Sequence, residues 1–477
     1  MRHSNPPASR GFTLVEVLVG LVLGLIAIVI MYQVFATFES QRRTSVAGGD
    51  AQSAGHLSLY SMERELRLAG LGLMYLFRDV DTYDSQSACP VGVSMYSAKS
   101  GVVTAAPGIP AVPVLVTDRG TGYGANSDSL VITYGPSAAS GAPNLVLANV
   151  GQGLALDKDN VNVGIRVQAA PFIDTAAVPP KNAVFNKNDI IMVAQPASDL
   201  TIPAGGYKNC VRLKVSDVQI AAGSDPLKPD AVLKVDPGAS FDENPPAGTG
   251  GFFPATGYVF ADRPVVIHLG TTLAQTEYKV DPATNQLTVG APGAAATPIA
   301  EGVVSLQIQY GIGPKPGDTI GGFQCDPDAT LAQADPDCQR IRAWTDAAGV
   351  YDGVDWSKLN TVPANMQQRL KDIKRIKAVR IAVVTRSQNL ERDVLYGAAG
   401  SSAAIQAKAT CTAGGDIVSA AGAFRVCAWA DGTNPDGTAS LAPRIDLTGM
   451  ADWDRYRYRV YETMVPLRNV IWGSKSS

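Results

Sequence analysis

The sequence has few of the residues that most enzyme sites need. Histidine occurs only as His3, His56 and His268, and none has a cysteine or second histidine at metal-ligand spacing. Neither GxSxG, a P-loop, HExxH nor a strand followed by GxGxxG is present. An excess of one charge is also missing, because 40 basic residues face 43 acidic ones. The composition therefore predicts a protein that is not an enzyme and implies no nucleic-acid partner.

Cysteine is present six times, but never as CxxC, which argues against a zinc site or a thioredoxin-type site. The even count and wide spacing, behind an export segment, predict three structural disulfides in an oxidising compartment. Sequence order suggests two local pairs and one distant pair, although other connectivities remain open. The suggested pairs are Cys325–Cys338, Cys411–Cys427 and Cys89–Cys210.

Three loops combine Asp and Asn with turn residues, at 157–162, 325–338 and 430–437. None has the complete calcium-loop spacing with its terminal glutamate. Asp and Asn are also common turn formers. We therefore expect no cofactor, with calcium as the one alternative to test.

Charged residues are absent from Val17 to Phe38. This run makes roughly 33 Å of helix at about 1.5 Å per residue, enough to cross a hydrocarbon core of about 30 Å. Arg2 and Arg10 precede the run, which places the N-terminus in the cytoplasm and the rest of the chain outside. A secretory signal would be shorter. A plain signal anchor fits the length but leaves Glu16 unexplained, since a carboxylate there costs about 1–3 kcal/mol without a cationic partner.

The stretch RGFTLVE at 10–16 resembles the type III signal of type IV pilins and pseudopilins. The resemblance implies that a prepilin peptidase cuts between Gly11 and Phe12 and that the new amine of Phe12 is methylated. It also implies that Glu16 meets the terminal amine of a neighbouring subunit. That pairing is physically reasonable, because each of the two charges is costly alone at this membrane depth.

Two glycine pairs mark the predicted helix. Gly20 and Gly24 form a GxxxG step that permits close helix–helix approach in lipid, although glycine is also simply common in membrane helices. The helix-bending proline of major pilins is missing between residues 11 and 73. Gly48 and Gly49 each cost about 1 kcal/mol relative to alanine, so a soft point or a break is expected there.

Beyond Phe38 the pattern becomes amphipathic and predicts a helix that packs on a sheet. Gly70 and Gly72 indicate its end. Two i,i+4 ion pairs, Glu39/Arg43 and Glu63/Arg67, are expected on its solvent-exposed face. The apolar stripe consists of Leu59, Met62, Leu66, Ala69 and Leu73.

After residue 75 the signals are those of strands, with one further helix at 363–376. The final strand alternates, and the prediction places Tyr456, Tyr458, Val460 and Met464 on a buried face. Arg455, Arg457 and Arg459 then form a face that we interpret as solvated rather than as a binding patch. The other expected strands are 128–135, 188–194, 263–270, 302–311 and 376–387. Stretches rich in Ala, Gly, Pro and Ser at 97–127, 136–187 and 223–257 indicate surface insertions or a second β-rich lobe.

Four segments, MERELRLAGLG, VVSLQIQYG, IKAVRIAVVTRS and YRYRVYETMVPLRNVIW, look like the PilW family of type IV pilus minor pilins. The resemblance implies an α+β, pilin-like fold in which a long N-terminal helix packs on an antiparallel sheet with large β/loop insertions. The expected parts are a leader at 1–11, a transmembrane and assembly helix at 12–38, its amphipathic continuation at 39–75, and an exterior domain at 76–477.

The implied function is structural. A minor pilin would wait in the inner membrane of a Gram-negative bacterium, help to prime assembly, and then lie at or near the pilus tip, where a bulky subunit has space. Expected partners are other minor pilins, the major pilin, the peptidase, the inner-membrane assembly platform and a tip adhesin. Two alternatives stay open: a minor pseudopilin of a type II secretion system, and an exterior adhesin or enzyme that uses residues 12–38 only as a tether.

Overall fold

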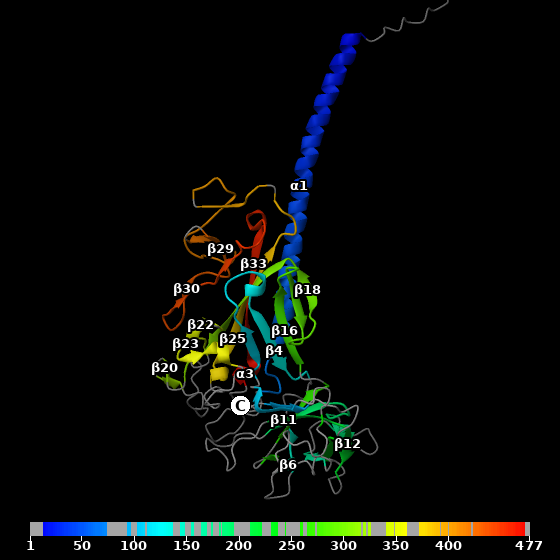
Figure 1. Cartoon of the computed structure of the whole chain (residues 1–477), viewed down its shortest axis with the longest axis vertical. Coiled ribbons are helices and arrows are strands. Elements are labelled where there is room, and N and C mark those ends of the chain that lie inside the picture. The colour runs from blue at the N-terminus through cyan, green and yellow to red at the C-terminus, as the bar shows by residue number, and fades with distance from the viewer. Residues whose placement is uncertain are drawn as a thin grey trace, which may run out of the picture.

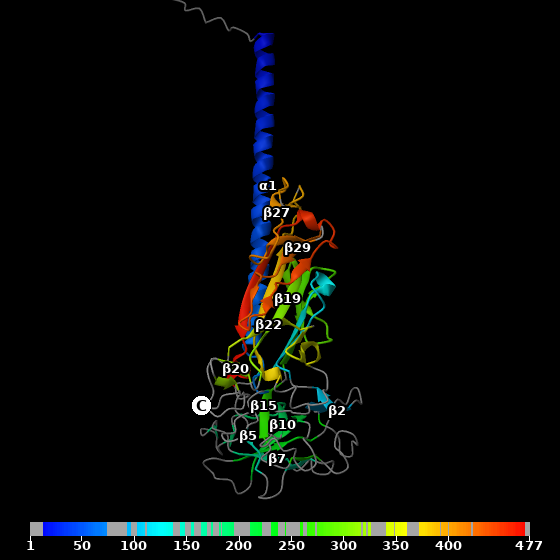
Figure 2. The ribbon, with the colours of Figure 1, turned by 90° about the vertical axis from the view of Figure 1, so that its left-hand side faces the viewer.

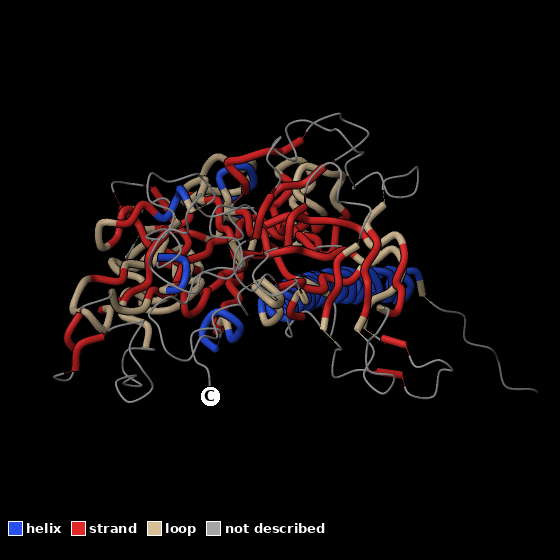
Figure 3. The backbone as a smooth tube through the Cα atoms, turned by 90° about the horizontal axis from the view of Figure 1, so that it is seen from below, coloured by secondary structure: helices blue, strands red, loops and turns tan. Residues whose placement is uncertain are grey.

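A long helix stands out from an elongated, β-rich body (Figure 1). The computed structural model describes residues 13–73, 112–136, 274–315, 340–347, 349–359, 372–391, 393–398, 400–420 and 423–472, with short segments between 93 and 271 and at 318–325. Seen from below, strands make up most of the body, and α1 runs along one side of it (Figure 3).

Helix α1 (Leu14–Leu66) has 53 residues, which correspond to roughly 80 Å of helix. It continues through Gly48 and Gly49, so the expected soft point does not break it. Without proline, every backbone N–H beyond the first turn can stay in the helical ladder. The helix ends at Leu66, earlier than the predicted end near Gly70, and the chain then continues through turns in which Gly70 and Gly72 have φ of 76° and 77°.

Two antiparallel sheets form the part of the body that contacts α1. The first has the order β22 (Ala343–Asp346), β19 (Val303–Ile312), β25 (Ile376–Arg386) and β33 (Tyr458–Pro466). The second has the order β18 (Thr297–Glu301), β17 (Gln286–Gly290), β16 (Ala274–Asp281), β4 (Ser129–Tyr134) and β3 (Val114–Thr117).

The apolar stripe of α1 lies in the core between these sheets. Leu59 is 9% exposed, and Met62 and Leu66 are fully buried. They share one cluster with Tyr278 of β16 and Ile308 of β19. The predicted stripe is therefore buried as expected, although Ala69 and Leu73 lie in the turns that follow the helix.

Strand β25 is buried on both faces, and only Arg380 and Arg386 among its residues are partly exposed. Val379 and Ile381 face the core under α1, whereas Ala382 and Val384 face a second cluster. That second cluster belongs to residues 395–450, which we call the C-terminal lobe. Helix, sheet and lobe thus form three layers, with the lobe on the opposite side of the sheet from α1 (Figure 1).

The C-terminal lobe consists of short strands joined by turns. Its Cys411 and Cys427 form a disulfide, the second of the two local pairs that sequence order suggests. The strands are β26 (Tyr396–Gly397), β27 (Ile405–Gln406), β28 (Ile417–Ala420), β29 (Ala423–Cys427), β30 (Gly432–Thr433), β31 (Ala439–Ser440) and β32 (Arg444–Asp446).

Side chains accept the backbone hydrogen bonds along the part of β19 that has no neighbouring strand on one edge. Its partner β22 covers only Gln309–Ile312, so the earlier N–H groups need other acceptors. Leu306 donates its N–H to Oγ of Ser127 at 2.8 Å, and Ile308 donates to Oδ2 of Asp128 at 2.7 Å. Burial raises the pKa of Asp128 well above its usual range, and the charge of Asp118 adds to the shift.

A separate lobe lies at the end of the body farthest from the start of α1 (Figures 1 and 2). We call it the distal lobe; it contains the described residues of 93–109 and 144–271. It has its own apolar cluster, which includes Val167, Ile191 and Leu213. In the same lobe, Nε2 of His268 lies 2.8 Å from Oδ2 of Asp189, and its ring packs against Phe185. His268 is therefore a buried side chain that contributes to the packing of this lobe.

The distal lobe contains one six-stranded sheet and smaller ones. The large sheet has the order β2 (Val103–Ile109), β1 (Val93–Tyr96), β11 (Cys210–Lys214), β10 (Ile190–Ala194), β15 (Val265–Gly270) and β5 (Asn144–Leu145). A three-stranded sheet joins β12 (Asp217–Ile220), β13 (Ala231–Lys234) and β7 (Ile165–Val167). Two pairs are β14 (Tyr258–Phe260) with β6 (Leu154–Leu156), and β8 (Ile173–Asp174) with β9 (Lys181–Asn182).

Most of this lobe is an insertion into a hairpin. Strands β4 and β16 are antiparallel neighbours, and Tyr134 at the end of one pairs with Ala274 at the start of the other. Residues 135–273 therefore leave and re-enter the sheet at the same place. The earlier segment 93–109 joins the lobe through β1, which pairs in parallel with β11.

The expected strands are confirmed in β4, β10, β15, β19 and β25. The helix predicted at 363–376 falls mostly outside the described residues. A short helix that the sequence reasoning missed, α3 (Arg468–Trp472), follows the last strand. The remaining short strands are β20 (Asp318–Ile320), β21 (Phe323–Cys325), β23 (Val350–Tyr351) and β24 (Val354–Asp355).

Candidate functional site

The helix begins with a capping box that sequence reasoning overlooked. Thr13 is the N-cap, and its side chain accepts a hydrogen bond from the N–H of Glu16 at 3.4 Å. In return, Oε2 of Glu16 accepts from the N–H of Thr13 at 2.9 Å and from its hydroxyl at 3.0 Å. The sequence signal was available, since TLVE has the spacing of a capping box.

The capping box is compatible with the predicted processing. Gly11 and Phe12 lie outside the described residues, so cleavage and methylation there stay predictions. A cut between them leaves the Phe12–Thr13 amide intact, and with it the N–H that Glu16 accepts from. A carboxylate has room for several donors, so Glu16 can hold the helix start and still accept from a cation.

The first half of α1 is apolar and uncovered in this chain. Among the described residues, Leu14–Glu39 is the one helical stretch long and apolar enough to cross a membrane, and none of its apolar window is buried. A side chain added at Gly20 or Gly24 would meet nothing within 4 Å. This half of the helix therefore needs lipid or other helices around it, and the two glycines serve no contact within the chain.

The second half of α1 is fixed to β33 by a close contact that only glycine allows. A Cβ added at Gly55 would lie 2.1 Å from Cδ2 and 2.7 Å from Cγ of Tyr461. The neighbouring His56 packs on the same ring, with 5.1 Å between ring centroids. Further along, the hydroxyls of Ser61 and Tyr278 are 3.0 Å apart. Sequence reasoning missed Gly55, because a glycine within a helix carries no sign of its partner.

The interpretation of the last strand was wrong in part. Tyr458 and Val460 do pack against the C-terminal lobe, but Met464 is 58% exposed. The opposite face is solvent-exposed at Arg457 and Arg459, as expected, yet Tyr461 and Val465 farther along that face belong to the core under α1. The reason is that β33 lies between two layers, so alternation alone does not tell which face is wet.

The last strand begins later than predicted, so Arg455 and Arg457 precede β33 and Arg459 lies within it. Arg457 donates from Nε to Oε1 of Glu391 at 2.6 Å, and Arg455 donates from Nε to the backbone carbonyl of Glu391 at 2.9 Å. Arg459 is exposed and lines a groove beside α1. Of the two predicted i,i+4 pairs, Glu63–Arg67 is present at 2.5 Å, while the side chain of Arg43 is outside the described residues.

Little in the described part of the chain suggests metal chemistry. It contains no group of three His, Cys, Asp or Glu that could hold a metal ion. In the loop at 430–437, Asp431 accepts from Arg444 at 2.9 Å and Asp436 accepts from the Tyr351 hydroxyl at 2.6 Å. The loop at 157–162 and nearly all of 325–338 lie outside the described residues.

Cys89 and Cys338 fall outside the described residues, and so do the side chains of Cys210 and Cys325. The pairs Cys89–Cys210 and Cys325–Cys338 therefore stay predictions.

Two models of known protein families match this chain, one near its N-terminus and one over much of its C-terminal half. Residues 7–32 match the family model of the prokaryotic N-terminal methylation motif. Residues 271–469 match the family model of type IV pilus-assembly protein W, PilW. No curated protein and no solved structure matches the chain.

The two matches agree with the geometry described above. The methylation motif covers the exposed apolar start of α1 together with Glu16, and the PilW match begins just before β16 and runs through β33 into α3. Most of the distal lobe precedes the PilW match. Together, the two matches support a PilW-family type IV pilin.

Proposed function

We propose that this pilus minor pilin lies at or near the tip of a type IV pilus and helps to start its assembly. The observation that carries the proposal is the position of the distal lobe, at the opposite end of the molecule from the apolar half of α1 (Figure 1). In a fibre built around such helices, a subunit in the shaft has neighbours beyond its body. At the tip that space is empty, so the lobe meets no neighbour.

Before assembly, the chain is held in the inner membrane by α1, with its N-terminus in the cytoplasm and its body in the periplasm. The basic residues before the apolar run support this orientation. The prepilin peptidase then cuts after Gly11, and Phe12 becomes the methylated terminus. The body is a structural element rather than an enzyme, in keeping with its family.

Entry into the fibre requires more than apolar surface. Lipid tails already cover the exposed leucines and valines of α1, so the hydrophobic effect does not favour moving them from lipid to neighbouring helices. Close packing and polar pairing must supply the difference. Gly20 and Gly24 offer the close approach, and Glu16 offers a carboxylate for the amine of a neighbouring major or minor pilin.

The test uses fibres sheared from cells that make the native chain. Mass spectrometry should recover a peptide that begins with N-methyl-Phe12, and gold-labelled antibody against the distal lobe should mark fibre ends. Label spread along the shaft would refute the tip position. A chain found only in the inner membrane with Met1 intact would refute the pilin role, whereas a secretion defect in cells with normal pili would favour the type II pseudopilin alternative.

A further inference from the structure

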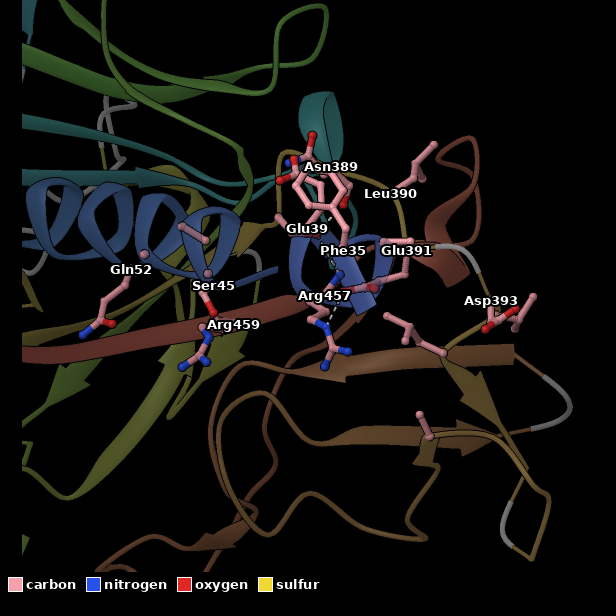
Figure 4. A pocket seen from close by; sticks show the side chains of 18 of the residues that line it. Phe35, Glu39, Ser45, Gln52, Asn389, Leu390, Glu391, Asp393, Arg457 and Arg459 are labelled. Carbon is pink, nitrogen blue, oxygen red and sulfur yellow. Dashed lines mark hydrogen bonds and ion pairs between the residues drawn. The ribbon is translucent and has the colours of Figure 1, made fainter. Parts of the chain in front are cut away.

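A groove of about 1440 Å³ runs between α1 and the described residues of 387–395, 402 and 404 in the body. It lies where the apolar run of α1 ends. Figure 4 shows Phe35 and Glu39 of α1 gathered with Asn389 and Glu391, while Arg457 comes from just before β33 and Arg459 from its start.

The groove lies at the level of the lipid headgroups when α1 spans a membrane. The apolar stretch Leu14–Glu39 has 26 residues and is roughly 39 Å long, whereas the hydrocarbon core is about 30 Å thick. The last six or so residues of the stretch therefore extend into the headgroup layer. Phe35, which is 69% exposed, and Glu39 both belong to this part of α1 and line the groove.

The walls of the groove carry both charges. Arg457 is paired with Glu391, and the groove also contains the cation of Arg459 and the carboxylates of Glu39 and Asp393. A purely anionic headgroup would meet these carboxylates unfavourably. A headgroup that carries a phosphate and an ammonium group can place one near arginine and the other near a carboxylate.

The mouth of the groove also offers apolar surface. Leu390 and Val394, in the loop opposite α1, are 42% and 54% exposed. Apolar side chains at the membrane boundary bind well to the upper part of acyl chains, with basic side chains beside them at the phosphates. Together with Phe35, they make a surface suited to a lipid that stands upright in the outer leaflet.

We infer that this groove binds the headgroup of a zwitterionic phospholipid of the outer leaflet while the subunit waits in the membrane. The inference rests on the membrane-anchored state in the proposed function. The bound lipid fixes the depth of the waiting subunit. It must leave before the helix enters the fibre, because neighbouring helices then take the place of lipid around Phe35.

The experiment uses the full chain, extracted from membranes in mild detergent and also reconstituted in vesicles of phosphatidylethanolamine and phosphatidylglycerol. Native mass spectrometry should show one retained phosphatidylethanolamine per chain. Arg459→Gln should lower the retained fraction by up to about fivefold, because an exposed ion pair with the headgroup phosphate contributes up to about 1 kcal/mol. Leu390→Ser should lower it as well, because it removes the apolar contact beside the headgroup.

Two matched controls separate the groove from the general surface. Arg42 is exposed on α1 one turn beyond Glu39 and does not line the groove, so Arg42→Gln should leave lipid retention unchanged. Leu441 is 59% exposed in the C-terminal lobe away from the groove, and Leu441→Ser should also have no effect.

Three outcomes would overturn the inference: no retained lipid, equal losses in the groove and control variants, or a groove residue that cross-links to another protein chain in the resting membrane. Recovery of N-methyl-Phe12 in fibres together with no retained lipid would reject the groove and keep the pilin role. Retained lipid without any processing at Gly11 would reject the pilin role and keep the groove.

Discussion

Replacing Gly55 by alanine tests whether α1 is fixed to the sheet by one close contact. Two effects oppose each other. Alanine is about 1 kcal/mol more favourable than glycine within a helix. The new Cβ would lie 2.1 Å from Cδ2 of Tyr461, and such overpacking costs about 1–3 kcal/mol. We therefore expect Gly55→Ala to leave the free energy of opening unchanged or to lower it by up to about 2 kcal/mol.

Gly48→Ala is the matched control, because a Cβ at Gly48 meets nothing within 4 Å. It should stabilise the helix by about 1 kcal/mol, which corresponds to roughly fivefold slower hydrogen exchange. The assay is hydrogen exchange of the α1 amides from 44 to 66 in the full chain in detergent. The two alanine variants should thus differ by about 1–3 kcal/mol, the size of the overpacking alone.

A double substitution makes the result decisive. In the background of Tyr461→Ala the ring is gone, so Gly55→Ala should now stabilise the helix as Gly48→Ala does. The reasoning would be refuted if Gly55→Ala stabilised the native chain as much as Gly48→Ala, or if the effect of Gly55→Ala did not depend on Tyr461.

Three further outcomes are expected. Cys411→Ser with Cys427→Ser, which opens a loop with a sequence separation of 16, should destabilise the C-terminal lobe by about 3 kcal/mol and speed its proteolysis, while the distal lobe is unaffected. Because the folded-state pKa of Asp128 is raised, mainly by burial, the folded chain keeps that proton to a higher pH than the unfolded chain. Its contribution to the free energy of unfolding should therefore fall as pH rises above about 4, and Asp128→Asn should flatten this part of the urea-midpoint profile. Glu16→Ala should still be cleaved after Gly11 but should be lost from sheared fibres on immunoblots; normal incorporation would contradict the pairing with a neighbouring amine.

The sequence predicted the parts of the fold that depend on local periodicity. The buried stripe of Met62 and Leu66, the turn at Gly70 and the strands β19 and β25 all follow from spacing and β-branched content. These elements are long and strongly patterned, which is where such reasoning is most dependable.

What the sequence did not predict depends on contacts between distant residues. The two-sided burial of β33 requires knowing that the C-terminal lobe covers one face and α1 the other. Gly55 resembles any helical glycine until Tyr461 is placed beside it. The groove, likewise, is lined by Phe35 and Arg459, which are more than four hundred residues apart in the sequence. No local sequence pattern predicts that such distant residues line one groove.

The insertion of the distal lobe between Tyr134 and Ala274 makes the length of the lobe independent of the sheet that carries it. Both ends of the insertion leave the sheet side by side, so its length can change without shifting the register of β4 and β16. Doubling the length of a flexible connection between two strands costs only about 0.6 kcal/mol in loop-closure entropy. The distal lobe can therefore change in size or surface without disturbing the packing of α1 on the two sheets. A transplant would have to carry the segment 93–109 as well, because β1 supplies a strand to the same lobe.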